Sequence, residues 1–484
     1  MSGQKSIRVN FIMNIILTMS SFIFPLISFP YISRVLLPDG TGRVSLATSV
    51  VSYFLIFAQL GIPTYGIRKC AQVRDNPKEL NQVAQELLII NLVTSCITYM
   101  AYLIVIFTVP RFEKEKWLYL VVSVTILFNV IGMEWLYKGL EQYTYITVRS
   151  VIFKFIALLM MFLFVRKRGD YIVYGALTVF ASSASNLFNL FHARHYISLK
   201  PVHNYHFKRH LTAIGIFLAM SCATTVYVNL DTIMLGIIKS DIDVGYYNAA
   251  VKIRAVLLGI VTALGSVLLP RVSFYIKKNM QDQFVRVVRK AIEFVVISAL
   301  PLTIYFIIFA EEGIYFLSGQ AYSGAMIPMR LIMPTVFIVG ISNITGLEIL
   351  IPRGQEVIVL YSEIAGAVID LVINSVLIPS FGCSGAAVGT LIAEFIVLLV
   401  QLYALKDLRR EMFGGINYIT IIGANIISLI SVLWVKKLRL DCFWILMISF
   451  AVYFTIYGIL LLLFKEPLIT EIVRKQIRKL RDIY

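Results

Sequence analysis

Apolar runs of about 20 residues recur along the whole chain, and they limit what it can fold into. A helix of this length spans the hydrocarbon core of a bilayer, so a chain made mostly of such helices needs lipid as its solvent. Composition agrees with this reading, because 59% of the 484 residues are hydrophobic, only 15% are charged and the mean hydropathy is +0.82. The sequence therefore predicts an all-α polytopic membrane protein.

These runs predict about fourteen transmembrane helices. Their approximate ranges are 9–32, 43–62, 83–109, 117–136, 146–166, 171–192, 211–238, 244–269, 284–310, 325–350, 357–379, 383–405, 416–435 and 441–464. The connections between them are short, which leaves no room for a soluble catalytic domain on either side of the membrane. An even number of spans also places both termini on one side.

The distribution of positive charge indicates which side that is. The net charge of +17 would suggest nucleic acid binding in a soluble protein, but here Lys and Arg gather between the apolar runs. With the connections assigned alternately, about 28 of the 44 Lys and Arg residues lie on the side of the termini, about 12 on the other side and about 4 within spans. The positive-inside rule therefore predicts cytoplasmic termini, and no nucleic acid partner is expected.

A long repeat divides the chain. Residues 34–76 return at 233–279 with an offset of about 203 residues, and Gly42 aligns with Gly245. Self-similarity at a long, fixed period indicates a duplicated structural unit. In membrane transporters, such a duplication places the working site between the two halves.

A second echo matches KGLE at 138–141 with RGQE at 353–356. The halves then fall at 1–200 and 201–410, with six predicted helices each, while 411–484 holds two further helices and a basic cytoplasmic tail. Because each half has an even number of spans, the repeat is parallel and its pseudo-two-fold axis runs along the membrane normal. We therefore expect two six-helix lobes around a central cavity, followed by two C-terminal helices.

Basic residues inside or beside the spans are the candidates for substrate binding. A charge at mid-bilayer costs roughly 2.5–3.5 kcal/mol, so such residues should face protein or water and are functional candidates by default. The candidates are Arg254, Lys154, Arg34, Arg43 and Lys252. Arg254 lies about ten residues from the outer end of the eighth span, roughly 15 Å deep. Lys252 lies about 200° around the same helix and cannot share its face. Arg34 and Arg43 flank the first outer turn, where an interfacial role and a cavity role both stay open.

Polar stripes accompany these cations. Lys154 continues a stripe through Thr147 and Ser150 in the fifth span, and that stripe is predicted to line water. The first span carries a second stripe on one face, made of Asn10, Asn14, Thr18 and Ser21. Both patterns favour a wet cavity within the membrane.

Acidic residues within the spans are candidates for ion coupling or for charge pairing. They are Asp231 in the seventh span, Asp370 and Glu363 in the eleventh and Glu394 in the twelfth. One interpretation is a cationic cavity for an anionic headgroup, with these carboxylates as its partners. The alternative is that each charge is neutralised by a neighbour in a buried pair or reaches the membrane interface.

Motifs for catalysis or for cofactor binding do not occur in the sequence. There is no nucleophile elbow, no HExxH and no P-loop, so no enzyme activity and no cofactor are predicted. Transport would then draw on an ion gradient, the membrane potential or the gradient of the substrate.

Five histidines lie close together in one cytoplasmic connection: His192, His195, His203, His206 and His210. No cysteine or acidic residue completes a zinc set there, so no metal site is predicted.

Three stretches of this sequence resemble a known family. They are RVLLPDGTGRVSLATSVVSYFLIFAQLGIPTYGIRKCAQVRD at 34–75, EWLYKGLEQYTYITVRSVIFK at 134–154 and NLDTIMLGIIKSDIDVGYYNAAVKI at 229–253. Together they resemble the bacterial polysaccharide-repeat flippases, of the O-antigen type, in the multidrug and oligosaccharidyl-lipid exporter superfamily. The chain is similar along essentially its whole length, in the same order.

The resemblance implies a two-lobed transporter of the bacterial plasma membrane, which moves undecaprenyl-diphosphate-linked oligosaccharides from the inner to the outer leaflet by alternating access. It also implies membrane lipids, a proton or sodium gradient and a polysaccharide polymerase as partners. The lipid II flippases, which are similar too, use arginines of the first, second and eighth spans, which here are Arg34, Arg43 and Arg254.

Other functions stay open. A drug or cation antiporter of the same superfamily would need a net acidic cavity, which Arg254 and Lys154 do not favour. A membrane-embedded polymerase or glycosyltransferase would usually carry a large extramembrane loop or an acidic metal-binding motif. A purely structural assembly protein would leave the charges within the spans unexplained.

Overall fold

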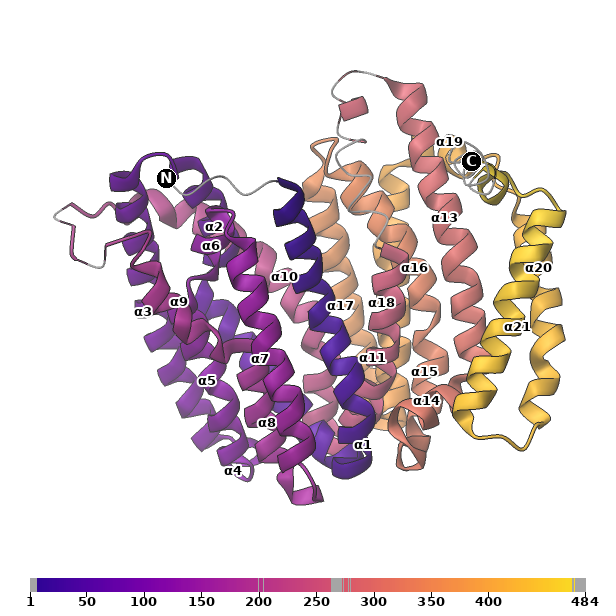
Figure 1. Cartoon of the computed structure of the whole chain (residues 1–484), viewed down its shortest axis with the longest axis horizontal. Helices are drawn as coiled ribbons and strands as arrows, with labels where there is room; N and C mark the ends of the chain where they lie inside the picture. The colour runs from indigo at the N-terminus through magenta and orange to yellow at the C-terminus, as the bar shows by residue number, and fades with distance from the viewer. Residues whose placement is uncertain are drawn as a thin grey trace, which may run out of the picture. The chain divides into compact units, whose positions relative to one another are not determined.

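The structure is a computed structural model that describes residues 7–262 apart from 199 and 203, together with 272, 274–276, 278, 280–471 and 474. Within these residues all regular secondary structure is helical and no strand occurs (Figure 1). The predicted all-α class is confirmed. Large apolar side chains such as Ile97 and Val376 leave 64% and 67% of their surface exposed, as expected for helices whose solvent is lipid.

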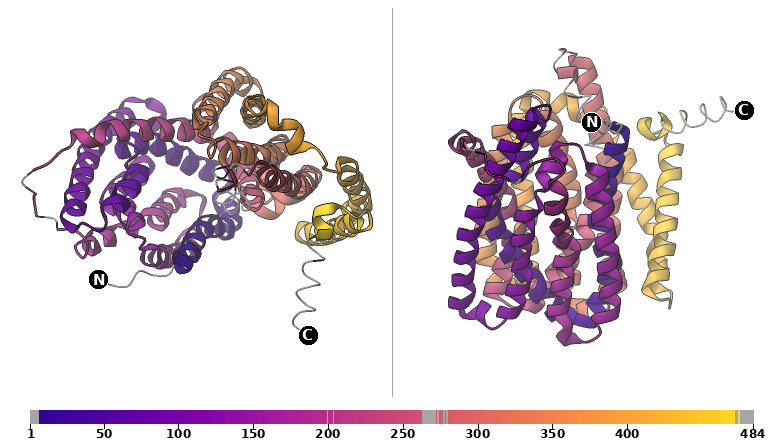
Figure 2. Two further views of the ribbon diagram at one scale, coloured as in Figure 1. Left: turned by 90° about the horizontal axis from the view of Figure 1, so that it is seen from above. Right: turned by 60° about the vertical axis from the view of Figure 1, so that its left-hand side comes forward.

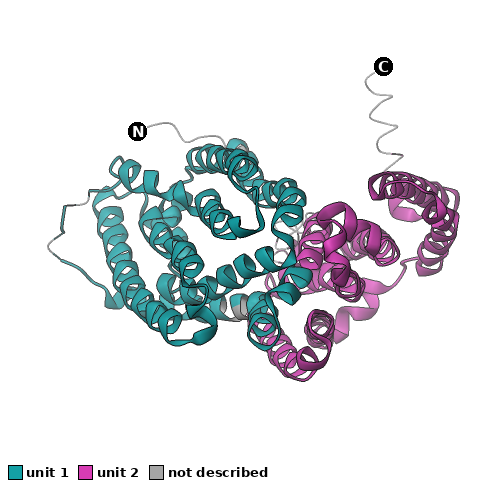
Figure 3. Cartoon of the chain, turned by 90° about the horizontal axis from the view of Figure 1, so that it is seen from below, with its two compact units in different colours: residues 1–248 teal, residues 249–484 magenta. Residues whose placement is uncertain are grey.

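Two compact units divide the chain, Met1–Asn248 and Ala249–Tyr484 (Figure 3). The boundary falls within α11 (Asp241–Thr262), so the first unit holds the whole first predicted lobe together with α10 (Lys208–Ile238). Units defined by packing and lobes defined by a sequence repeat are different divisions. The predicted lobe boundaries near residues 200 and 410 stay a prediction.

The first unit is built around a long N-terminal helix. Before α10, its helices are α1 (Ile7–Gln59), α2 (Ile62–Val73), α3 (Pro77–Thr108), α4 (Pro110–Glu113), α5 (Lys116–Gly132), α6 (Glu134–Gly139), α7 (Tyr143–Phe164), η1 (Arg168–Asp170), α8 (Tyr171–Val179), η2 (Phe180–Ala184) and α9 (Asn186–Ala193). α1 packs against α3, α5, α7 and α10, and the long helices of this unit run alongside one another (Figure 2).

The second unit contains the remaining helices. After α11 they are α13 (Gln281–Ile308), α14 (Ala310–Ser318), η3 (Gln320–Ala325), α15 (Met326–Ile332), α16 (Pro334–Asn343), η4 (Ile344–Leu350), α17 (Glu356–Phe381), α18 (Cys383–Ala404), α19 (Lys406–Phe413), α20 (Tyr418–Val432), η5 (Leu433–Lys437) and α21 (Cys442–Leu463). α20 and α21 pack as an antiparallel pair, drawn in yellow in Figure 1.

Each unit has a cluster of buried side chains among its described residues. In the first unit, Tyr65, Leu87 and Leu136 pack together where α2, α3 and α6 meet. In the second unit, Tyr305 of α13 packs against Tyr453 of α21. The Tyr305 hydroxyl lies 2.8 Å from the Ser449 hydroxyl, so the C-terminal helix pair is fixed to α13 by both packing and a buried hydrogen bond.

α1 contains two of the predicted spans. Its 53 residues would measure about 80 Å if straight, whereas the hydrocarbon core is about 30 Å thick. The chain is redirected at Leu37, whose φ of 59° is outside the helical region and which precedes Pro38. A residue before proline is disfavoured in the α region, so this dipeptide separates two arms that are each long enough to cross a bilayer.

Ten helical segments of the described residues are long and apolar enough to cross a membrane, or eleven if the bent pair Gln320–Ile332 and Pro334–Leu350 is one span. One of the ten, Ile12–Val73, contains both arms of α1 together with α2. Each of the fourteen predicted ranges coincides with helical structure over its described residues, and 263–269 of the eighth range lie outside them. The multi-pass class is confirmed, and the count of fourteen stays a prediction.

The glycines aligned by the repeat meet each other in the first unit. A Cβ atom added to Gly42 would lie 1.7 Å from the carbonyl oxygen of Asp241 and 3.0 Å from the amide nitrogen of Gly245. A Cβ on Gly245 would lie 2.2 Å from the carbonyl oxygen of Pro38. The start of the second arm of α1 therefore touches the start of α11 backbone to backbone, which only glycine permits at both positions.

Candidate functional site

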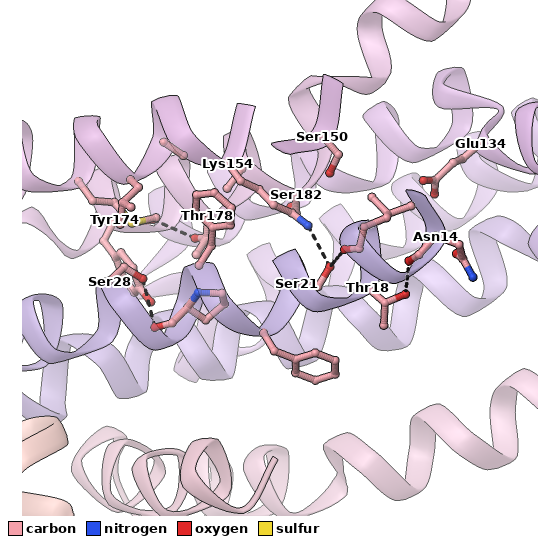
Figure 4. Close-up of a pocket in the computed structure, with 18 of the residues that line it drawn as sticks. Asn14, Thr18, Ser21, Ser28, Glu134, Ser150, Lys154, Tyr174, Thr178 and Ser182 are labelled. Carbon is pink, nitrogen blue, oxygen red and sulfur yellow. Dashed lines mark hydrogen bonds between the residues drawn. The ribbon is translucent and has the colours of Figure 1, made fainter. Parts of the chain in front are cut away.

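A pocket of about 560 Å³ opens within the first unit, between α1, α6, α7, α8 and η2 (Figure 4). Most of the polar side chains in its wall are uncharged: Asn14, Thr18, Ser21, Ser28, Ser150, Tyr174, Thr178 and Ser182. Figure 4 places Asn14 and Glu134 near one end and Ser28 and Tyr174 near the other. A volume of this size is typical of small-molecule sites.

Lys154 of α7 projects across this pocket to α1 (Figure 4). Its Nζ atom donates to the hydroxyl oxygens of Ser20 and Ser21 at 2.8 and 2.9 Å. Hydroxyl groups satisfy two of the three ammonium protons without neutralising the charge. The ammonium group therefore stays available as a positive charge for an anion.

The charges in the wall add up to a positive pocket. Glu134 is the acidic lining residue among those described, and it lies 3.5 Å from the ammonium group of Lys138, which also lines the pocket. The opposite charges of Glu134 and Lys138 cancel each other, so the net positive charge of the wall is that of Lys154. An anionic ligand is thus favoured over a cationic one.

The polar stripes predicted from the sequence divide between the pocket and the packed interior. Asn14, Thr18 and Ser21 of α1 line the pocket together with Ser150 and Lys154 of α7. Thr147, by contrast, is 1% exposed and donates to the carbonyl oxygen of Met13 at 2.9 Å, and Asn10 is also buried. The stripes therefore identify the faces of α1 and α7 that meet each other. The N-terminal residues of both stripes are buried in the helix contact, and the later residues line the pocket.

Arg254, in contrast, is part of an ion pair in the second unit. Its Nη2 atom lies 2.7 Å from Oε1 of Glu394, and its Nε atom donates to the Thr335 hydroxyl at 2.6 Å. Both charged side chains are largely buried, with 15% and 9% of their surfaces exposed. These two candidates therefore form a buried ion pair with each other, as the charge-pairing alternative would have it, and their roles stay a prediction.

A double-mutant cycle is expected to show strong coupling between Arg254 and Glu394. Removing one partner leaves the other charge buried without its counter-ion, so Arg254→Ala and Glu394→Ala should each lower thermal stability, and the double variant should recover part of the loss. We expect a coupling free energy of about 1–3 kcal/mol from unfolding in detergent. The pair Arg74–Glu141, also 2.7 Å apart but with 35% and 45% of its side-chain surfaces exposed, is the matched control and should show much weaker coupling. Additive losses at Arg254 and Glu394 would contradict this.

Arg43 is also held by carboxylates. It contacts Asp39 at 3.0 Å, Glu115 at 2.5 Å and, more distantly, Asp241 at 3.9 Å, while its guanidinium group lies over the ring of Tyr171. Arg111 binds the same Asp241 at 2.5 Å. This ionic cluster lies at the contact between Gly42 and Gly245 and reinforces it.

The other predicted candidates take several environments. Arg34 is exposed and donates to the Pro30 carbonyl oxygen of its own helix at 2.5 Å, and Lys252 is partly buried on α11. Asp231 is buried and accepts a hydrogen bond from the Tyr247 hydroxyl.

Two candidates share a face of α17. Asp370 is 1% exposed, whereas Glu363, two turns earlier, is partly buried. Gly389 of α18 packs closely against Asp370, because a Cβ atom added to Gly389 would lie 3.0 Å from a carboxylate oxygen of Asp370. Both carboxylates belong to the second unit, whereas the residues that line the Lys154 pocket belong to the first.

Arg149 was missed by the sequence analysis. Arg149 belongs to α7, and its Nη2 atom donates to the amide oxygen of Asn186 on α9 at 3.3 Å. Its Nε and Nη1 atoms are buried without a hydrogen-bond partner among the described residues. Its guanidinium group lies over the ring of Tyr145, which stacks on His192 at 4.0 Å. The signal was available, since Arg149 is a basic residue inside a predicted span.

Taken together, these features define a multi-pass helical membrane protein with a positively charged pocket inside its first unit. A family model described as "Polysaccharide biosynthesis protein" matches residues 7–276, which is more than half of the chain, so this protein belongs to that family. The resemblance seen in the sequence is thereby confirmed.

Individual proteins agree with this assignment. The "Putative O-antigen transporter" of Escherichia coli (strain K12) is 22% identical over 409 residues, covering 84% of this chain and 98% of the relative. Among solved structures, "Lipid II flippase MurJ, inward closed conformation" matches 95% of this chain and 100% of that chain, with a TM-score of 0.74 and 14% identity. An inward-facing multidrug resistance MATE family transporter of the MOP superfamily matches 84% and 99%, with a TM-score of 0.62 and 13% identity. The two structural matches establish a shared fold.

Proposed function

We propose that this protein is a flippase that carries lipid-linked oligosaccharide repeat units across the bacterial plasma membrane for surface polysaccharide biosynthesis. The observation that carries the proposal is the Lys154 pocket: an unneutralised ammonium group within a membrane-embedded helical unit, surrounded by hydroxyl groups. A lipid-linked sugar presents an anionic diphosphate and many hydroxyl groups, and this lining complements both. Membership of the polysaccharide biosynthesis family and the name of the Escherichia coli relative support it.

The carrier lipid we propose is undecaprenyl diphosphate. The diphosphate would bind Lys154, the adjacent sugar would meet the serine and threonine hydroxyls of α1 and α8, and the polyprenyl chain would stay in the bilayer. The fold shared with proteins named for inward closed and inward-facing conformations supports transport by alternating access. We further infer cytoplasmic termini, coupling to a proton or sodium gradient, and cooperation with a polysaccharide polymerase.

A drug or cation antiporter is the second candidate, because the MATE transporter shares the fold. The positive charge of the pocket favours the flippase, since a cationic drug would be repelled by Lys154. Purified protein in vesicles distinguishes the two. Delivery of a diphosphate-linked oligosaccharide lipid to the opposite leaflet supports the flippase, and gradient-driven export of a cationic dye without lipid delivery would contradict it.

Replacing Lys154 should reduce lipid delivery sharply. A hydrogen bond to a charged group contributes about 1.5–3 kcal/mol, so Lys154→Met should slow delivery by about 10- to 100-fold, while Lys154→Arg keeps the charge and most of the rate. The assay is leaflet-specific labelling of the oligosaccharide in vesicles. The control is the exposed Lys167→Met, which should deliver lipid at the original rate. Equal rates for Lys154→Met and the original protein would remove Lys154 from the site.

A further inference from the structure

Glu348 is a buried carboxyl group in the second unit that no contact in the described structure explains. It is 1% exposed, and neither carboxyl oxygen has a hydrogen-bond partner among the described residues. It lies in η4, a π-helical turn at the end of the tenth predicted span. π-helical turns are rare and occur often at functional sites.

Among the described elements, α13, α16, α17 and α18 pack against this turn. α16 carries no ionisable residue. The charged residues of the other three elements form no ion pair with Glu348 in the part of the chain that the structure describes. They are Asp282, Arg286, Arg289, Lys290 and Glu293 of α13, Glu356, Glu363 and Asp370 of α17, and Glu394 of α18. An ionised carboxylate at this place would therefore be a buried and uncompensated charge, so the neutral, protonated form fits these surroundings.

The polar groups around η4 are neutral. The Thr345 hydroxyl donates to the Gln401 side-chain oxygen at 2.6 Å, and the Gln401 amide donates to the Ser362 hydroxyl at 3.1 Å. This buried chain provides dipoles beside the turn and no counter-ion. A proton is therefore the cation that balances Glu348 most directly.

The sequence echo in the first half has a carboxylate next to the position aligned with Glu348, and that carboxylate has a partner. The echo of 138–141 in 353–356 places Glu348 opposite Met133, next to Glu134. Glu134 lies 3.5 Å from Lys138, whereas Arg353, the counterpart of Lys138, is exposed. Among the described residues, Glu348 therefore has no partner that corresponds to the Lys138 of Glu134.

The helix that contains Glu348 is also broken in a way that permits movement. Gln320–Ile332 and Pro334–Leu350 are bent by 43° relative to each other, with Pro334 at the break and the π turn at the far end. A segment with two discontinuities can rearrange without unfolding the helices around it. Such a rearrangement would alternately bury Glu348 and expose it to water.

We propose that Glu348 binds and releases a proton during each transport cycle, which makes the proton the coupling ion of this protein. The O–H bond of the carboxyl group forms with a proton from the aqueous phase on one side of the membrane, and it breaks when the group meets water on the other side. This inference rests on the proposed flippase function for its role in transport. The binding of the proton itself is independent of that function.

Infrared difference spectroscopy of the full-length protein in lipid vesicles tests the proton site without any transport. Between acidic and alkaline pH, the carbonyl stretching band of a protonated carboxyl group should appear in the original protein and be lost in Glu348→Gln. Glu348→Asp keeps a carboxyl group and should retain a shifted band, which guards against a folding defect. Glu356→Gln is the control, because Glu356 is exposed one turn beyond the same segment. Identical difference spectra for the original protein and Glu348→Gln would overturn the proposal.

Transport in the same vesicles tests the coupling. With an imposed pH gradient, lipid delivery should rise several-fold in the original protein and in Glu356→Gln, and it should be insensitive to the gradient in Glu348→Gln. Acceleration by a sodium gradient alone would overturn the assignment of the proton. If the original protein delivers no lipid, the flippase proposal fails, and the infrared result still decides whether Glu348 takes up a proton.

Discussion

Replacing Gly42 with alanine is expected to remove most of the folded protein. The added methyl group would lie 1.7 Å from the Asp241 carbonyl oxygen, which is backbone and cannot rotate away. Overpacking against side chains typically costs about 1–3 kcal/mol, and a clash with backbone should cost more, so we expect a loss of at least about 3 kcal/mol. Thermal unfolding followed by size-exclusion chromatography in detergent measures it.

The reciprocal variant and a matched control make this prediction sharper. Gly245→Ala should have a similar effect, because its methyl group would lie 2.2 Å from the Pro38 carbonyl oxygen. Gly458 of α21 has no neighbouring atom within 4 Å of an added Cβ, so Gly458→Ala should leave stability unchanged or raise it by up to about 1 kcal/mol through better helix propensity. A Gly42→Ala protein with the unfolding temperature of the original would show that this contact is dispensable.

The same glycines show what sequence self-comparison can reveal. The repeat aligned Gly42 with Gly245 without indicating why glycine is needed, and the structure supplies the reason in the contact between the two helices. The all-α class and the positions of the helices were equally accessible, because runs of about 20 apolar residues have few alternatives in a membrane.

Breaks within helices were not accessible in the same way. Met133 with φ 43° interrupts the predicted span 117–136, and the π-helical turns η2 and η4 lie inside the predicted spans 171–192 and 325–350. Hydropathy averages over a whole window, so a local change in backbone hydrogen bonding leaves no trace in it.

The candidate site was partly predictable for a related reason. Residues spaced at three or four positions identify one face of one helix, and this brought Lys154 and the polar face of the first span into consideration. Which faces meet depends on the register between helices, so the pairing of Arg254 with Glu394 and the binding of Arg43 by Glu115 required coordinates. Glu348 was overlooked because it lies only two residues from the predicted end of its span.

Glu86 of α3 is the residue whose removal should most disturb the connection that leads into α10. It is fully buried and accepts hydrogen bonds from the His206 amide at 2.6 Å, from Arg209 Nη2 at 2.7 Å and from the Gln82 side chain at 3.1 Å. Its contact with His210 Nε2 measures 2.7 Å. One carboxylate thus fixes both the end of the connection and the first turn of α10 to α3.

Glu86→Ala should lower stability by about 3–5 kcal/mol, because Arg209 and the buried His210 lose their acceptor together. The local consequence is faster amide hydrogen exchange at 204–210, measured by mass spectrometry, with α7 unaffected. Glu86→Gln keeps an acceptor oxygen and loses the charge, so it should fall between the original protein and Glu86→Ala. The exposed Glu113→Ala is the control and should change neither measurement. Unchanged exchange at 204–210 in Glu86→Ala would mean that packing alone, rather than this carboxylate, holds the connection, and the stability loss would then have to arise elsewhere.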